Sequence, residues 1–306
     1  MSRILKKIFI GIIGISLITF TLITVILWNF SNNIPDYKFL KNYKPPVSSK
    51  VYSGNGELVS DFSKEKRIFV PYSSIPQKVI NAFLSAEDKN FFSHPGVDAK
   101  GVLRATINNI SNILSSKRLE GASTITQQVA KNFLLTNEVS LNRKIKEAIL
   151  AFRIERALSK ERILELYLNQ IYLGSGAYGV AAASLEYFDK SIKELNYVES
   201  AMLAALPKAP SKYNPYRNLD LAKFRRDLVL KNLLENNFID LNQLALEKGF
   251  KSIGAVKLSI LLLGFRVSKR QRLSDWSVDI LSESQLEYAA IDAWICPLIL
   301  ERLNRC

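Results

Sequence analysis

Two adjacent carboxylates, Glu87 and Asp88, lie in a part of this sequence suited to acid–base chemistry. Apolar residues at helical spacing precede them and a helix-ending run follows at residues 93–96, so we expect Glu87 near the C-terminal end of an amphipathic helix. Phe91 and Phe92 would shield a carboxylate from water, raise its pKa and suit it to take a proton from a sugar hydroxyl. Taken alone, the stretch fits a solvated acidic helix end better.

A second polar cluster spans residues 121–132, where hydroxyls, two amides and Lys131 lie in a loop that leads into a helix. These groups suit sugar hydroxyls and phosphate oxygens, and the amides at a helix N-terminus add affinity for anions. A third cluster, Arg143, Lys144 and Glu147, occupies one helical turn, because spacings of three and four bring side chains together. A simple salt bridge between Arg143 and Glu147 explains that turn equally well.

Composition limits the classes of protein that these clusters can serve. The 306 residues carry a net charge of +14 with 48% hydrophobic residues, which is enough for a folded core and indicates an anionic partner: nucleic acid, a membrane surface or a phosphorylated lipid. Cys296 and Cys306 are too few for a disulfide framework or a zinc site. His94 is the only histidine, which excludes a His-rich metal centre, and no Gly-x-x-x-x-Gly-Lys phosphate-binding loop occurs.

The N-terminal region predicts a membrane anchor. Residues 8–28 carry no charged side chain and are long enough for one spanning helix, and Arg3, Lys6 and Lys7 before them place the N-terminus in the cytoplasm. A cleaved signal peptide is the alternative, but no small-residue cleavage pattern follows. We therefore expect a cytoplasmic tip and transmembrane helix over residues 1–30 and a proline-containing linker over residues 31–46.

Short elements are predicted to position the three clusters. Residues 47–70 alternate around Gly54-Asn55-Gly56, which indicates a small β-hairpin, and the chain is almost wholly helical from Ser74 onward. We expect a helical region over residues 141–171, interrupted near Ser159 as an N-cap and closed by Gly174. Further helices are expected over residues 197–206 and 219–236.

Five stretches, in order along the chain, resemble the motifs of peptidoglycan glycosyltransferases, found in class A penicillin-binding proteins and monofunctional transglycosylases. They are residues 87–96, 121–132, 143–147, 160–169 with Gly174 and Gly179, and 199–214. One departure is Asp189, where the family usually has glycine, and it touches no acidic or cationic site position. Five ordered matches are far more specific than any one alone.

The resemblance implies a mainly α, lysozyme-like glycosyltransferase domain over residues 47–240, behind the single transmembrane helix. It also implies a hydrophobic patch between about Val97 and Leu119, and a periplasmic location at the bacterial inner membrane. The implied reaction polymerises lipid II onto a growing glycan strand with inversion and release of polyprenyl diphosphate. Cell-wall synthesis proteins are implied as partners.

The resemblance also implies roles for individual residues. Glu87 would be the general base on the acceptor hydroxyl, and Glu147 would assist departure of the diphosphate. The implied substrate-binding residues are Asp88, His94, Ser123, Thr124, Gln127, Gln128, Lys131, Asn132, Arg143, Lys144 and Asn169. No cofactor is required, although a divalent cation, Mg²⁺ or Mn²⁺, could act at the diphosphate.

Two other functions stay open for the same domain. A lysozyme-like glycan hydrolase would also use two carboxylates, but it has no diphosphate leaving group for Arg143 and Lys144 to neutralise. A membrane-anchored binding protein with an inactive site is the third possibility. Both Glu87 and Glu147 are present within intact motifs, which favours an enzyme.

Residues 241–306 do not continue the glycosyltransferase pattern, and we expect no transpeptidase domain in them. They resemble the last part of a 3'-5' exonuclease domain of the ribonuclease D type, in which Tyr288 and Asp292 match a Tyr-x-x-x-Asp motif. There the tyrosine orients water and the aspartate binds a metal, together with carboxylates from an earlier strand. We expect this helical fragment to be inactive and nucleic acid not to be a partner, with nucleic-acid processing as the alternative.

Overall fold

The computed structural model describes residues 34–43, 50–55, 58–61, 65–115, 121–136, 138, 140–251, 254–268, 270–278 and 280–304, with scattered positions between 10 and 28. Most of the predicted membrane anchor, residues 8–28, lies outside the described residues. Within the described part of the chain, no helix combines the length and the apolar character that a membrane crossing requires.

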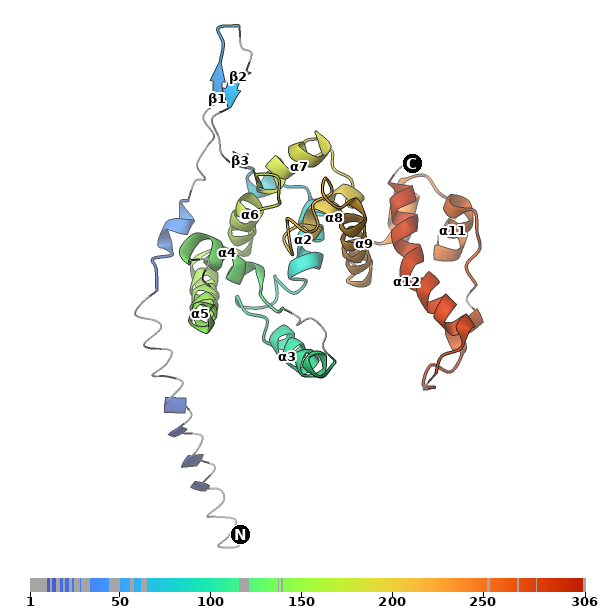
Figure 1. Ribbon diagram of the computed structural model, residues 1–306, viewed down its shortest axis with the longest axis horizontal. Helices are drawn as coiled ribbons and strands as arrows, with labels where there is room; N and C mark the ends of the chain where they lie inside the picture. Colours follow the sequence, from blue (N-terminus) through green and yellow to red (C-terminus); the bar gives the residue numbers. More distant parts are fainter. Residues whose placement is uncertain are drawn as a thin grey trace. The chain divides into compact units, whose positions relative to one another are not determined.

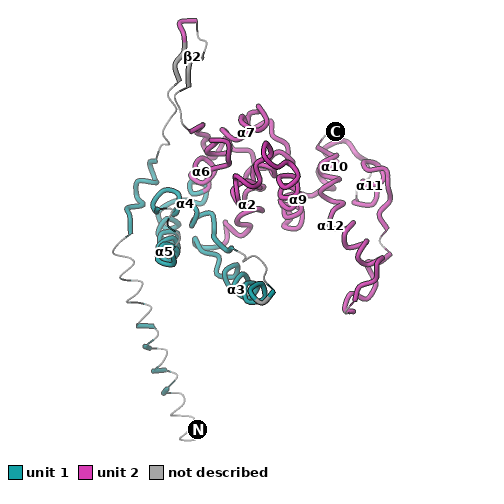
Figure 2. The backbone as a smooth tube through the Cα atoms, in the orientation of Figure 1, with its two compact units in different colours: residues 1–43, 94–163 teal, residues 44–93, 164–306 magenta. Residues whose placement is uncertain are grey.

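The chain divides into two compact units, shown in different colours in Figure 2. Unit 1 comprises residues 1–43 and 94–163, and unit 2 comprises residues 44–93 and 164–306. The order of elements confirms the expectation of a mainly helical chain (Figure 1). Each unit is described by itself.

Unit 1 is built around two packed helices, α4 (Ile125–Leu134) and α5 (Leu141–Ala157). The side chains that they bury include Ile125, Val129, Leu150 and Ile154. The Ser140 hydroxyl caps α5 by accepting a hydrogen bond from the Arg143 backbone amide at 3.2 Å. The unit also contains the short 3₁₀ helix η1 (Lys38–Lys41) and the first residues of α6 (Lys160–Gln170).

Helix α3 (Ala99–Leu114) of unit 1 presents apolar side chains to solvent. Asp98 caps its N-terminus by accepting a hydrogen bond from the Gly101 amide at 3.0 Å. The exposed apolar side chains are Val102, Leu103, Ile107, Ile110 and Ile113. Their positions confirm the hydrophobic patch expected between the first and second motifs.

Unit 2 contains a helical core in which α8 (Tyr197–Ala205) and α9 (Leu219–Glu235) pack against α2 (Gln77–Glu87). Val79, Phe83, Leu203 and Leu230 are fully buried. Asn196 and Glu199 form a capping box that begins α8. These bounds confirm the predicted helices, including a helix that ends at Glu87.

The strands of unit 2 differ in part from the expectation. The predicted hairpin is present as β1 (Lys50–Tyr52) antiparallel to β2 (Leu58–Asp61). However, β3 (Lys66–Arg67) is not part of it and pairs in parallel with β4 (Ala177–Tyr178), which local sequence did not predict. The short 3₁₀ helix η2 (Tyr72–Ser74) follows β3, and α7 (Val180–Phe188) follows β4.

The predicted closure of the second helix by Gly174 is wrong, because α6 ends at Gln170. The Ile171 carbonyl accepts a hydrogen bond from the Gly179 amide at 2.8 Å, and the Leu173 amide donates to Ala177. These bonds turn the chain back towards β4, and Gly174 lies in that turn with φ of 89°. The Ser159 N-cap of α6 is confirmed, since its hydroxyl accepts from the Arg162 amide at 3.3 Å.

The C-terminal segment is folded and belongs to unit 2. It consists of α10 (Leu241–Glu247), α11 (Ala255–Leu263), the 3₁₀ helix η3 (Arg270–Leu273) and α12 (Glu283–Leu303). A separate buried cluster joins the three α-helices: Ala245, Leu258, Val267, Ile295, Ile299 and Leu303. Helix α12 also packs against α9 (Figure 1). There, Nη2 of Arg226 on α9 lies 3.6 Å from Oε2 of Glu301 on α12.

Candidate active site

The centre of the candidate site in unit 1 is a buried carboxylate on α5, Glu147, whose side chain is 1% exposed. Its Oε1 accepts a hydrogen bond from the Arg143 guanidinium, and its Oε2 accepts one from Nζ of Lys144 at 2.6 Å. A buried anion is tolerated when cations compensate it. The predicted turn is confirmed, including its salt bridge, and it concentrates two cations beside one carboxylate.

Lys144 extends this centre towards the loop before α4. Its Nζ donates to the Ser123 hydroxyl at 2.9 Å, which brings the second and third motifs together. Partial burial, then the positive charges of Arg143 and Lys131, lower the pKa of Lys144 despite its ion pair with Glu147. Arg143 and Lys131 therefore both lie close enough to Lys144 to act on its charge, and such a cluster of cations suits a polyanionic group.

The beginning of α4 places the polar residues of the second motif in two environments. Thr124 and Gln127 form a capping box in which the Thr124 hydroxyl accepts from the Gln127 amide at 3.2 Å. Both side chains are buried, and their hydrogen bonds stabilise the start of α4. Their part in substrate binding stays a prediction. Gln128 is half-buried and Asn132 is exposed, at spacings that put them on the same side of the helix as Lys131.

The loop of the first motif packs on α5. Gly96 has φ of 101°, and a Cβ atom there would lie 2.8 Å from the backbone carbonyl atoms of Ala151. His94 is buried, and its Nδ1 accepts a hydrogen bond from the Gly96 amide at 3.2 Å. The Thr124 hydroxyl donates to the Gly96 carbonyl at 2.6 Å. His94 thus shapes the loop, while contact with a substrate stays a prediction.

Glu155 is a positioning residue that the motif analysis did not single out. Its Oε1 accepts hydrogen bonds from the Thr126 hydroxyl at 2.6 Å and from Nζ of Lys160 at 2.8 Å. Lys160 also donates to the His94 carbonyl at 2.7 Å. This network ties α4, α5, α6 and the His94 loop together. No local spacing could have revealed it, because its members come from four separate segments.

The first acidic pair lies in unit 2. Glu87 is the last residue of α2 and is half-buried, and Asp88 is buried at the position that follows the helix. Phe91 is fully buried whereas Phe92 is 52% exposed, so only one of the two predicted aromatic shields is inside. Glu87 therefore occupies the predicted helix end, and its role as a base stays a prediction.

Tyr167 of α6 lies in the same part of unit 2. Its ring packs edge-on against Phe83 of α2, with ring centroids 6.2 Å apart, and the residue is fully buried. Burial, then the nearby carboxylates of Glu87 and Asp88, raise the pKa of Tyr167 well above its usual value. The phenol therefore stays neutral near the two carboxylates.

Asn169 has a structural position in unit 2. Its Oδ1 accepts from the Val70 amide at 2.8 Å, and its Nδ2 donates to the carbonyls of Val70 and Glu165. Glu165 in turn accepts from the Tyr72 amide at 2.7 Å. The pair attaches the extended chain after β3 to α6. The substrate-binding role expected for Asn169 stays a prediction.

Unit 1 brings together Ser123, Lys131, Arg143, Lys144 and Glu147, while Glu87, Asp88 and Asn169 belong to unit 2. Among the described residues, no group of three or more His, Cys, Asp or Glu side chains is arranged to hold a metal ion.

In the C-terminal segment, the centroids of the Tyr288 and Trp276 rings lie 6.1 Å apart. The side chain of Asp292 lies outside the described residues.

Comparisons with known proteins agree with these motifs. Residues 55–234 match the family model described as Transglycosylase, and residues 218–305 match one described as 3'-5' exonuclease. The two matches overlap over residues 218–234, which are almost all of α9. The predicted boundary at residue 240 stays a prediction.

Individual relatives show the same likeness. Penicillin-binding protein 1A of Rickettsia felis is 56% identical over 70% of this chain and 27% of its own length, and that of Aquifex aeolicus is 50% identical over 77% of this chain and 32% of its own. The chain thus spans about a third or less of these relatives. A crystal structure of Penicillin-Binding Protein 1A from Haemophilus influenzae matches 69% of this chain and 21% of its own, with 27% identity and a TM-score of 0.37.

The similarity covers the acidic pair at the end of α2, the start of α4 and the charged turn of α5. The C-terminal segment is similar to a different kind of protein. Because its Transglycosylase match extends over more than half of its residues, the chain belongs to the transglycosylase family.

Proposed function

We propose that this chain is a peptidoglycan glycosyltransferase that polymerises lipid II into glycan strands. The observation that carries the proposal is the buried Glu147 between Arg143 and Lys144, with Lys131 close enough to affect the pKa of Lys144. Such a centre suits a leaving group that develops negative charge, as a diphosphate does. Membership of the transglycosylase family supports the same reaction class.

In the proposed reaction, the 4-hydroxyl oxygen of the acceptor sugar attacks the anomeric carbon of the donor. The bond from that carbon to the diphosphate oxygen breaks as the new glycosidic bond forms, so the configuration is inverted. Glu87 takes the hydroxyl proton, a step worth about 10²- to 10⁴-fold in rate. Arg143, Lys144 and Lys131 offset the charge of the departing polyprenyl diphosphate, and Glu147 holds Arg143 and Lys144 in place.

The charged turn on α5 also bears on divalent cations. Both oxygens of Glu147 are occupied by Arg143 and Lys144, so this carboxylate is poorly suited to bind Mg²⁺ or Mn²⁺ without displacing a cation. Side-chain cations are therefore the proposed source of charge neutralisation. Polymerisation measured with EDTA and with added Mg²⁺ or Mn²⁺ tests this, because strict dependence on an added ion would contradict it.

We also propose that residues 8–28 anchor the chain in the bacterial inner membrane, with the N-terminus cytoplasmic and the catalytic residues periplasmic. The uncharged run and the preceding cations support this topology. The exposed apolar side chains of α3 would meet the same membrane. Protease protection of N-terminal and C-terminal epitopes in spheroplasts tests the orientation, and proteins of cell-wall synthesis are the proposed neighbours.

Polymerisation of labelled lipid II by the full chain in liposomes tests the reaction. We expect long glycan from the wild type and at least 100-fold less from Glu87→Gln and Glu147→Gln. Glu161→Gln is the matched control, since Glu161 is exposed in the first turn of α6 and should behave like the wild type. Soluble sugars in place of polymer would indicate a glycan hydrolase, and binding without turnover would indicate an inactive protein.

The C-terminal segment is proposed to be inactive as a nuclease, although its family match raises nucleic-acid processing as a second possibility. The support is the Tyr288 and Asp292 motif, which supplies one carboxylate where two-metal chemistry needs several. Mg²⁺-dependent degradation of single-stranded DNA or RNA by the full chain, lost in Asp292→Ala, would overturn this. No degradation by either protein is the expected result.

A further inference from the structure

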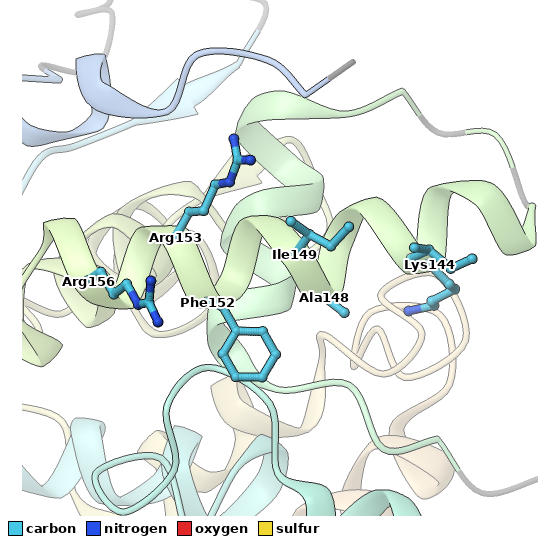
Figure 3. Close-up of a pocket in the computed structure, with 7 residues that line it drawn as sticks. Lys144, Ala148, Ile149, Phe152, Arg153 and Arg156 are labelled. Atoms are coloured by element: carbon cyan, nitrogen blue, oxygen red, sulfur yellow. The ribbon is translucent and has the colours of Figure 1, made fainter. Parts of the chain in front are cut away.

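Helix α5 carries a groove of about 620 Å³. Of the residues that line it, only Lys144 has a role in the proposed reaction. Its lining residues follow one face of the helix: Lys144, Ile145, Ala148, Ile149, Phe152, Arg153 and Arg156. Figure 3 shows Lys144 at one end of this face and Arg156 at the other. The buried residues of α5 lie on the opposite face of the helix, as helical spacing requires: Glu147, Leu150 and Ile154.

The chemistry of the lining matches an amphiphile with a negative charge. Four of the seven residues are apolar and form the middle of the groove, and the other three are cations. None of the lining residues that the structure describes is a carboxylate; Glu147 is buried on the core side, and Glu155 accepts hydrogen bonds from Thr126 and Lys160. An acyl chain would bury apolar surface here, while an anionic group would meet the arginines.

The positions of the cations select one kind of amphiphile. Arg153 and Arg156 are three residues apart at one end of the groove, and although Figure 3 shows their guanidinium groups on different sides of α5, rotation of the side chains can bring both to a single phosphate. Lys144 lies about 18 Å from Arg156 along the helix, at 1.5 Å per residue. A polyprenyl diphosphate bound at Lys144 would place its uncharged chain, and no anion, beside the two arginines. A phospholipid with its phosphate at the arginines pairs with both of them and leaves Lys144 to its bonds with Ser123 and Glu147.

We propose that this face of α5 is a binding site for an anionic phospholipid of the surrounding membrane. The phosphate binds between Arg153 and Arg156, and one acyl chain lies along Phe152, Ile149 and Ile145. The described lining of the groove includes none of the exposed apolar side chains of α3. The inference does not depend on glycosyl transfer, since it concerns lipid binding alone.

Photolabelling of the full chain in nanodiscs tests this site. The discs contain phosphatidylcholine with a small amount of phosphatidylglycerol that carries a diazirine in one acyl chain, and labelled peptides are mapped by mass spectrometry. We expect label on Ile145, Ile149 and Phe152, displaced by unlabelled phosphatidylglycerol and not by phosphatidylcholine. The double variant Arg153→Gln and Arg156→Gln should lose roughly tenfold of that label.

A variant with the same change in charge, Lys223→Gln with Lys231→Gln on α9, is the control and should keep the α5 label. Thermal unfolding of both variants shows whether they are folded. Equal labelling by a diazirine phosphatidylcholine, or label unchanged in the arginine variant, would overturn the proposal. So would stronger displacement by polyprenyl diphosphate, which would assign the groove to the donor, or a cross-link from position 149 to residues 8–28.

Discussion

Lys144 and Glu147 form an ion pair of 2.6 Å across one turn of α5, in which the carboxylate side chain is 1% exposed and that of the lysine is 46% exposed. The pair therefore connects a buried anion to a cation that solvent and ligands can reach. Arg143 holds the other oxygen of the same carboxylate. Two cations are thus oriented by one carboxylate.

Replacement of Glu147 by glutamine should destabilise the protein as well as reduce polymerisation. The amide removes the charge that compensates Arg143 and Lys144 in a buried place, and breaking such a pair costs about 3 kcal/mol. Chemical denaturation measures the free energy of unfolding, with Glu161→Gln as the exposed control. An unchanged free energy of unfolding would mean that Arg143 finds another partner in the variant.

The lowered pKa of Lys144 predicts how activity depends on pH. As pH rises, Lys144 loses its positive charge at a lower pH than an ordinary lysine does. Polymerisation should therefore begin to fall at a pH below the one at which an ordinary lysine loses its proton. Lys144→Arg keeps the charge and should move the fall to higher pH. The pH profile of initial rate for both proteins tests this, and identical profiles would exclude Lys144 as the titrating group.

The lowered pKa of Lys144 also affects the free energy of unfolding, which should rise with pH where activity falls. The unfolded chain holds the Lys144 proton more tightly than the folded one, so this group adds stability as pH rises from the folded pKa to the unfolded pKa. In Lys144→Gln that increase should be absent. Unfolding free energies measured across the alkaline range, wild type against variant, show whether it is.

Gly96→Ala should disrupt the loop that packs on α5. The backbone at Gly96 has φ of 101°, and the added methyl group would meet the Ala151 carbonyl at 2.8 Å, so we expect a loss of about 2 kcal/mol or more. Gly121→Ala is the control, because no atom lies within 4 Å of its added Cβ. Thermal unfolding compares the two, and equal melting temperatures would contradict the packing of this loop.

The C-terminal cluster predicts that the tail contributes to a cooperative fold. Ile299→Ala removes a fully buried side chain of α12 and should cost about 2–5 kcal/mol, whereas Leu286→Ala, on an exposed part of the same helix, should cost little. Hydrogen exchange of α12 and α9 in each variant reports where protection is lost. Equal effects of the two substitutions would contradict a packed tail.

Much of this protein was determined by its sequence at short range. The spacing of Arg143, Lys144 and Glu147 was sufficient to predict their shared turn, and apolar periodicity predicted that α2 ends at Glu87. The Ser159 cap was also predictable, because a cap bonds to an amide only three residues away. Interactions over three or four residues follow from helix geometry alone.

The tertiary structure decided the rest. It paired β3 with β4, buried Phe91 while leaving Phe92 exposed, and turned the chain at Gly174 after α6 had ended. It also brought Glu155 into hydrogen bonds with Thr126 and Lys160, and packed Gly96 against the backbone of Ala151. These contacts connect segments whose separation along the chain carries no periodic signal. They form only when packed helices bring the segments together, because burial then requires each polar group to find a partner.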